Sequence, residues 1–194
     1  MDRFLKAARE LLADSDIGDV TVQRVAERSG QSLRSFYQYF SGKHELLLAL
    51  LEEDVAWTAR HIALVVATVD DPLVRLELFV FECHRLSLPA APAWRPIEGE
   101  PHPTALAEFA QQLLTRHARE AGQAFGPLVD LLEGLLGDAG SANLLRPGLD
   151  HRRVAGVLLQ AVLFDAFAVT ISGSHLGHES NGALWAMLSH GIVA

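Results

Sequence analysis

The stretch that decides the fold covers residues 21–47 and reads TVQRVAERSGQSLRSFYQYFSGKHELL. It holds two short segments with helical apolar spacing on either side of Gly30. Thr21 and Ser32 stand where a side-chain hydroxyl can accept a hydrogen bond from the first turn of each helix. Gly30 stands where a helix commonly ends in the left-handed conformation. The stretch therefore predicts two capped helices joined by a tight turn.

Two helices in this arrangement form a helix-turn-helix, whose second helix enters the major groove of DNA. Val25 and Ala26 are expected to face inward, with Leu33 and Phe36 packed back against them. The other face of the second helix is polar, and tyrosine hydroxyls and a lysine follow it, which suit phosphate contacts. The predicted DNA-binding residues are Thr21, Gln31, Ser32, Arg34, Ser35, Tyr37, Gln38, Tyr39 and Lys43.

The charge of the chain is unevenly distributed. The whole sequence carries a net charge of −8, which by itself disfavours a nucleic-acid partner. Residues 20–44, however, hold three arginines and one lysine against one glutamate. From residue 46 onward there are nine arginines and seventeen carboxylates. This asymmetry is typical of a small basic head on an acidic body.

The order T-x-x-x-V-A-x-x-x-G-x-S-x-x-x-F-Y-x-Y-F-x-x-K-x-x-L resembles the DNA-binding head of TetR-family transcriptional repressors. Two positions depart from that family's usual pattern. Arg34 replaces a small residue and adds a donor fork for guanine, so operator preference is expected to differ. Gln31 replaces an aliphatic residue and either weakens the packing of the turn or gains a DNA contact. The matching residues are Thr21, Val25, Ala26, Gly30, Ser32, Phe36, Tyr37, Tyr39, Phe40, Lys43 and Leu46.

The remaining sequence predicts an all-α protein of about nine helices, without strand-length alternation. The apolar stretch at residues 154–172 is interrupted by Gln160 and Asp165, which favours a buried helix over a membrane span. The predicted helices beyond the helix-turn-helix lie at residues 4–12, 43–62, 72–88, 103–121, 125–137, 150–172 and 181–192.

We predict a helix-turn-helix domain at residues 1–45 and a helical body at residues 46–194. The resemblance implies that the body binds a ligand and forms a homodimer. Apolar residues at helical spacing mark either a ligand cavity or a filled core, because both need the same residue types. The candidate ligand-binding residues are Trp57, His61, Phe79, Cys83, His84, Phe109 and Leu113.

Dimerisation is assigned to the last two helices, which carry apolar surface and which typically join the subunits of the family as a four-helix bundle. The candidate interface residues are Leu159, Val162, Leu163, Ala166, Leu184, Trp185 and Leu188.

These features predict a ligand-responsive transcriptional regulator. It is expected to be a repressor that binds a palindromic operator as a homodimer and is released from the DNA by a small, largely apolar ligand. The expected partners are double-stranded DNA, the effector and a second copy of the chain. An alternative is a metal-assisted hydrolase using His175, His178 and Glu179, although the HLGHE order is not a metalloprotease motif and indicates a solvated loop. A third class is a helical interaction protein without a DNA role. No nucleophile–base spacing or phosphate loop supports catalysis, so we expect no enzyme, no cofactor and no metal.

The single cysteine, Cys83, excludes an internal disulfide and indicates a buried structural thiol. The N-terminus lacks the apolar segment of a signal peptide, so the predicted location is cytoplasmic. Trp94 lies in a proline-rich loop and serves either as a lid over a ligand site or as an anchor against the body.

Overall fold

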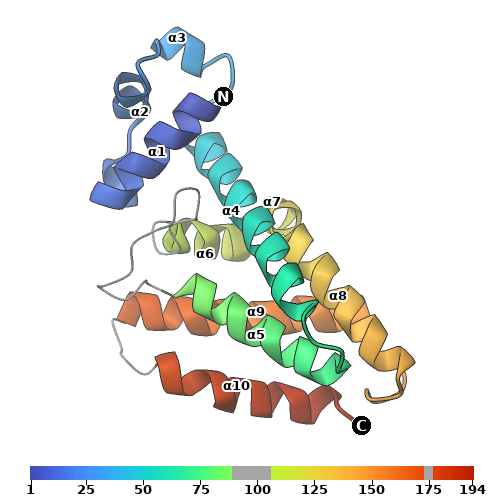
Figure 1. Ribbon diagram of the computed structural model, residues 1–194. Coiled ribbons are helices and arrows are strands. Elements are labelled where there is room, and N and C mark those ends of the chain that lie inside the picture. Colours follow the sequence, from blue (N-terminus) through green and yellow to red (C-terminus); the bar gives the residue numbers. More distant parts are fainter. Residues whose placement is uncertain (89–105, 173–176) are drawn as a thin grey trace.

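The computed structural model describes residues 1–88, 106–172 and 177–194, and for residues 169–172 and 177–181 it describes the backbone alone. These ranges form ten α-helices and one short 3-10 helix (Figure 1). The all-α prediction is confirmed, since the described residues contain an isolated β-bridge, Leu145 with Val193, and no strand. The elements are α1 (Asp2–Asp14), η1 (Ile17–Asp19), α2 (Val22–Ser29), α3 (Leu33–Phe36), α4 (Lys43–Val66), α5 (Pro72–Ser87), α6 (Ala107–Arg116), α7 (Ala118–Ala124), α8 (Gly126–Ser141), α9 (His151–Ser172) and α10 (Gly177–Ile192).

The head consists of α1, α2 and α3, and its turns follow the predicted capping chemistry. The Thr21 hydroxyl accepts a hydrogen bond from the Arg24 amide at 3.2 Å, and the Ser32 hydroxyl accepts one from the Ser35 amide at 3.0 Å. Gly30 ends α2 with φ of 65°, a left-handed conformation that favours glycine. The capped helix-turn-helix prediction is therefore confirmed.

An aromatic cluster forms the core of the head. Phe4 of α1 meets Phe36 edge to face at 5.4 Å between ring centroids, and Phe40 lies within reach of both rings. Tyr37 and Tyr39 contact the edge of this cluster through their rings and remain more than half exposed. The aromatic run thus fixes α3 and the turn after it on α1 and leaves two hydroxyls at the surface.

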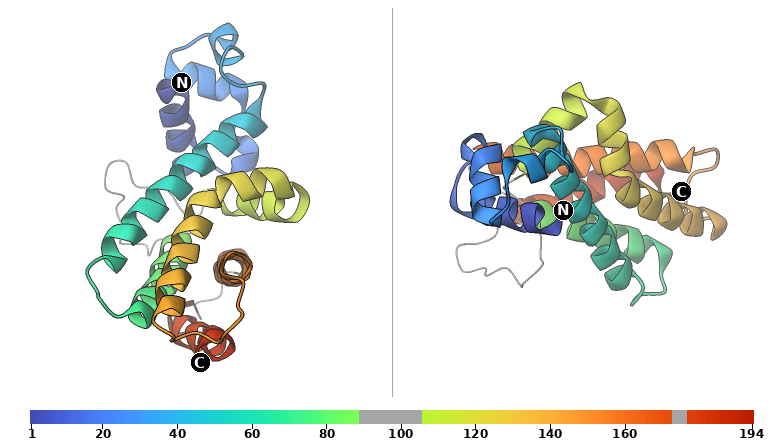
Figure 2. Two further views of the ribbon diagram at one scale, coloured as in Figure 1. Left: turned by 90° about the vertical axis from the view of Figure 1, so that its right-hand side faces the viewer. Right: turned by 90° about the horizontal axis from the view of Figure 1, so that it is seen from above.

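Helix α4 connects the head to the body. Its 24 residues span about 36 Å. It leaves the head beside α1 and descends along the body, so that the head stands at one end of the molecule (Figures 1 and 2). The predicted boundary at residue 45 lies in its first turn, so the head and the body share one continuous helix.

The body packs around α5, which contacts α4, α8, α9 and α10. Asp71 caps α5 by accepting hydrogen bonds from the Leu73 and Val74 amides, and Pro72 begins the helix without losing a needed donor. Helix α9 packs on α5 and α8, and α10 packs against α5 and α9 (Figure 1). None of the helices in the described ranges combines the length and the apolar character that crossing a membrane requires.

Several helix boundaries differ from the predicted ones. The predicted helix at 103–121 breaks at His117, whose φ of −130° and ψ of 59° are not helical, and this raises the number of α-helices to ten. Helix α3 ends at Phe36, and residues 37–39 continue as turns. Leu33 is 40% exposed, so its predicted inward packing is wrong. Helix α10 begins at Gly177, earlier than predicted.

Candidate DNA-binding head and body cavity

The predicted DNA-binding residues gather at the surface of the head. Arg34 and Gln38 are exposed on α3 and the turn after it, and Tyr37 is 59% exposed. The side chain of Arg34 forms no hydrogen bond or ion pair within the described residues. The exposed members of the set are Thr21, Ser32, Arg34, Tyr37, Gln38 and Tyr39, and the half-buried ones are Gln31, Ser35 and Lys43.

Gln31 completes the turn through its backbone. Its amide donates to the Ala26 carbonyl at 3.0 Å, beside the Gly30 amide that donates to Glu27 at 3.1 Å. This pattern satisfies carbonyls that α2 would otherwise leave unpaired. Because the backbone closes the turn, the half-buried Gln31 side chain has no part in its hydrogen bonding.

The side chain of Lys43 contacts backbone carbonyls of η1. Its ammonium donates to the carbonyl of Ile17 in η1 and lies 3.5 Å from the carbonyl of Gly18. Partial burial lowers the pKa of Lys43, and the nearby Asp19 carboxylate opposes that shift. Lys43 therefore ties the start of α4 to η1, a contact that sequence spacing did not reveal.

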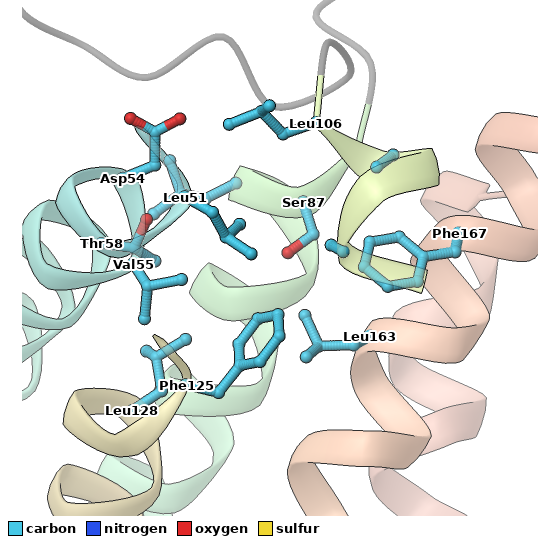
Figure 3. A pocket seen from close by; sticks show the side chains of 13 residues that line it. Leu51, Asp54, Val55, Thr58, Ser87, Leu106, Phe125, Leu128, Leu163 and Phe167 are labelled. Atoms are coloured by element: carbon cyan, nitrogen blue, oxygen red, sulfur yellow. The ribbon is translucent and has the colours of Figure 1, made fainter. Parts of the chain in front are cut away.

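A small cavity lies in the body between α4, α5, α6, α8 and α9. Its volume is about 70 Å³. Apolar side chains from these helices converge on it, with Asp54 at the edge of the set and the Ser87 hydroxyl within it (Figure 3). The described lining residues are Leu51, Asp54, Val55, Thr58, Leu86, Ser87, Leu106, Ala107, Ala110, Phe125, Leu128, Leu163 and Phe167.

The predicted ligand-binding residues lie on the helices around this cavity but none lines it. Trp57 stacks on His61 at 5.1 Å, and His61 lies 3.5 Å from Glu82. The residues Phe79, Cys83, His84, Phe109 and Leu113 are buried core. The predicted residues and the cavity lining thus share α4, α5 and α6 but lie on different faces of these helices.

His84 is fully buried, with its Nε2 atom 2.8 Å from Asp165 of α9. Its Nδ1 atom has no hydrogen-bond partner within the described part of the chain. Burial raises the pKa of the neighbouring Cys83 thiol to about 12, so that the thiol stays protonated at neutral pH. This agrees with a structural thiol and not with a nucleophile.

Asp54 contacts both the cavity and the head. Its carboxylate accepts a hydrogen bond from the Arg9 guanidinium of α1, while Glu53 accepts a second one at 3.0 Å. Burial raises the pKa of Asp54 to about 6, although the charge of Arg9 acts in the opposite direction. Since Arg9 and Asp54 are 45 positions apart, periodicity within one helix gives no sign of this pair.

Comparison with known proteins identifies the head. The family model described as "Bacterial regulatory proteins, tetR family" matches residues 4–50. The head is a helix-turn-helix domain of the TetR family of transcriptional regulators. This bears out the expectation of a DNA-binding transcriptional regulator.

The chain is also similar to an uncharacterised HTH-type transcriptional regulator of Mycobacterium tuberculosis, with 29% identity over 106 residues. The match covers 51% of this chain and 52% of that protein, so the chain spans about half the length of the curated relatives it matches.

Solved structures show that the fold extends over nearly the whole chain. FadR of Bacillus subtilis in complex with stearoyl-CoA is 16% identical, with a TM-score of 0.71 over 96% of each chain. Thermus thermophilus FadR in complex with lauroyl-CoA is 21% identical, with a TM-score of 0.71 over 95% of this chain and 92% of that one. At these identities the likeness shows the fold alone.

Most predicted dimer-interface residues of this regulator are buried within its own chain. Leu159, Val162, Leu163, Ala166 and Leu184 are each at most 8% exposed, so assigning them to a surface between subunits is wrong. Their side chains fill the space between α9 and its neighbours instead. Trp185 and Leu188 are half-buried, so part of each side chain remains at the surface of α10.

The apolar residues that α9 and α10 do expose are different ones. Val157 is 57% exposed, Phe164 40% and Met187 66%. We name these three residues the outer apolar face. Val157 and Phe164 are seven positions apart and so lie on one side of α9.

Some of the remaining candidate residues lie outside the part of the chain that the structure describes. Trp94 and His175 are outside the described residues. His178 and Glu179 belong to the backbone of α10 and not to a loop, which corrects the predicted solvated segment at those two positions.

Proposed function

We propose that this regulator is a repressor that binds a palindromic operator as a homodimer and leaves it when a small, largely apolar ligand enters the body. One observation carries the proposal. Helix α4 begins at Lys43 in the head and supplies Leu51, Val55 and Thr58 to the cavity wall. A change at the cavity therefore acts on the same rigid element that positions the head.

The head reads DNA through α3 and its flanks. Arg34 is exposed near the N-terminal end of α3, where residues of a recognition helix meet base edges, and its two donors pair with guanine. Tyr37 and Tyr39 present hydroxyls to phosphates, and Lys43 presents its ammonium group at the start of α4. Thr21, Gln31, Ser32, Ser35 and Gln38 complete the contact surface.

Two copies of the chain are needed to bind an operator with useful affinity. A single head covers few bases, whereas a dimer meets two half-sites about 34 Å apart. The outer apolar face supports dimerisation because three large apolar side chains on one surface lose water when two copies meet. A groove lined by Val157, Leu158 and Met187 between α9 and α10 offers space for a partner's side chains.

The cavity favours a small ligand. Pockets that hold drug-sized molecules measure roughly 300–1,000 Å³, far more than the 70 Å³ found here. The two FadR proteins are in complex with acyl-CoA molecules, and an acyl chain would enter this cavity only after the helices had moved apart. We therefore assign a smaller apolar molecule to the site.

Asp54 is the one charged side chain among the described lining residues. A ligand that carries a hydrogen-bond donor or a cation can replace Arg9 as the partner of Asp54. Such a ligand would release α1 from α4 and shift the population of dimers away from the DNA-competent one. A coupling of about 1–3 kcal/mol changes operator affinity roughly 5- to 150-fold, which is sufficient for induction.

Selection from a pool of randomised duplexes with the purified chain tests DNA binding. The expected product is a palindrome whose half-sites lie about one helical turn apart. A reporter gene with the selected site across its promoter should lose expression when the chain is present. A pool without enrichment contradicts DNA reading, and increased expression contradicts repression.

A further inference from the structure

Two histidines and one glutamate meet where α4 leaves the head. His44 lies in the first turn of α4, His117 at the junction of α6 and α7, and Glu120 in the first turn of α7. The Nε2 atom of His44 is 2.6 Å from the Oε2 atom of Glu120, and the Nδ1 atom of His117 is 3.8 Å from Oε1 of the same carboxylate. The ring centroids of the two histidines are 5.3 Å apart. One ligand atom from each residue lies within 4.8 Å of the others.

The chemistry of this group matches a transition-metal site. Imidazole nitrogen and carboxylate oxygen are common ligands of zinc, nickel, cobalt and copper. Metal–ligand bonds of about 2.1 Å place tetrahedral ligands roughly 3.4 Å from one another. The observed separations bracket that value, so small rotations of the three side chains bring them into position.

The three side chains are accessible to an ion, and one of them is held in place by packing. The side chains of His44, His117 and Glu120 are 49%, 46% and 35% exposed, so an ion can reach them and the side chains have room to rotate. The His44 ring packs edge to face on the buried Phe109 of α6 at 5.3 Å. Phe109 thus orients His44 toward the carboxylate, a role different from the ligand contact predicted for it.

We propose that His44, His117 and Glu120 bind one divalent transition-metal ion, with water completing the coordination. The ion would link the first turn of α4 to the start of α7. It would replace a single His44–Glu120 hydrogen bond by three bonds to a common centre. The competing explanation is a surface ion pair with no affinity for metals beyond that of any exposed histidine.

Cobalt binding tests the site directly. The untagged chain of 194 residues is titrated with Co²⁺ while visible absorption and equilibrium dialysis report coordination and stoichiometry. We expect one tightly bound ion, and we expect His44→Ala, His117→Ala and Glu120→Gln each to weaken it by more than about tenfold. Loss of even an outer-shell partner commonly costs 10- to 100-fold, and these residues are direct ligands.

Two controls separate this site from other histidines. His190→Ala removes an exposed histidine of α10 and should leave binding unchanged. The double variant His175→Ala/His178→Ala should also bind Co²⁺ as the unmodified chain does. Equal binding by all variants, or loss only in the double variant, overturns the proposal. Circular dichroism confirms that each variant is folded.

The site has a regulatory consequence that rests on the proposed function. An ion that ties α4 to α7 restricts the angle between the head and the body, so Zn²⁺ should change operator affinity by at least a few fold. Glu120→Gln should show no such change. Metal binding without an effect on DNA overturns this regulatory role and leaves the site intact. Absence of DNA binding at every metal concentration contradicts the proposed function and not the metal site.

Discussion

Arg9 of α1 and Asp54 of α4 form an ion pair between the head and the body, and Asp54 also lines the body cavity. The Asp54 side chain is only 13% exposed, whereas that of Arg9 is 31% exposed. The charge of a carboxylate with so little exposure to solvent is stabilised by its partner, because removing one member of a buried pair leaves an uncompensated charge. Asp54 is therefore the residue through which the proposed ligand would act on the position of the head.

Arg9→Met should lower the free energy of unfolding by about 1–2 kcal/mol at pH 7.5, less than for a fully buried pair because Arg9 is partly solvated. The deficit should shrink at pH 5, where Asp54 takes up a proton. Urea unfolding at both pH values measures it. Arg3→Met, on an exposed position of α1, is the matched control and should change stability by less than about 0.5 kcal/mol. An equal loss in both variants would show that the pair is not responsible.

The raised pKa of Asp54 predicts how stability depends on pH. Between the ordinary carboxyl pKa of about 3.9 and the folded value of about 6, the folded state holds a proton that the unfolded state has released. Asp54 thus contributes stability at low pH that is lost as the pH rises through about 6. Relative to Asp54→Asn, the unmodified chain should gain about 1 kcal/mol between pH 7 and pH 5. Parallel pH profiles for the two proteins would contradict the shift.

Arg34 and Lys43 should affect DNA binding in different ways. Arg34→Ala should cost about 1–3 kcal/mol at one guanine and relax the preference at that base pair. Lys43→Ala should weaken binding to all sequences and lower the salt slope by about one. It should also reduce stability slightly, because Lys43 binds the Ile17 carbonyl. If the Lys43 variant binds with an unchanged salt slope, its role is confined to the turn at η1.

Phe164→Glu should convert the proposed dimer to a monomer, because it places a charge in the outer apolar face. Sedimentation at micromolar concentration measures the change. Leu64→Glu introduces the same charge on α4 at a position that is 73% exposed, and it should leave the dimer intact. A Phe164 variant that remains dimeric would place the interface elsewhere.

The head was predictable from sequence because its signals are local. Thr21, Gly30 and Ser32 act on residues a few positions away, and Val25 and Phe36 are buried as predicted. The body was less predictable, because α4 and α9 are apolar on more than one side. Trp57 and Val55 are both large and apolar, yet Val55 lines the cavity while Trp57 stacks on His61.

The same ambiguity affected the dimer face. Leu163 and Phe164 are neighbours of similar character, and packing by α8 and α5 buries the first while leaving the second 40% exposed. Contacts such as Arg9–Asp54 and His44–Glu120 join residues 45 and 76 positions apart. Such pairs depend on how helices are placed in space, which helical spacing does not specify.

The most direct test of the account is a fluorescence-anisotropy titration of the selected operator at several salt concentrations. It is compared with a duplex in which one half-site is scrambled. We predict two chains bound per operator, a steep loss of affinity with salt, and a loss of at least about tenfold on scrambling one half-site. Equal affinity for both duplexes at every salt concentration would contradict operator recognition by a dimer of helix-turn-helix heads.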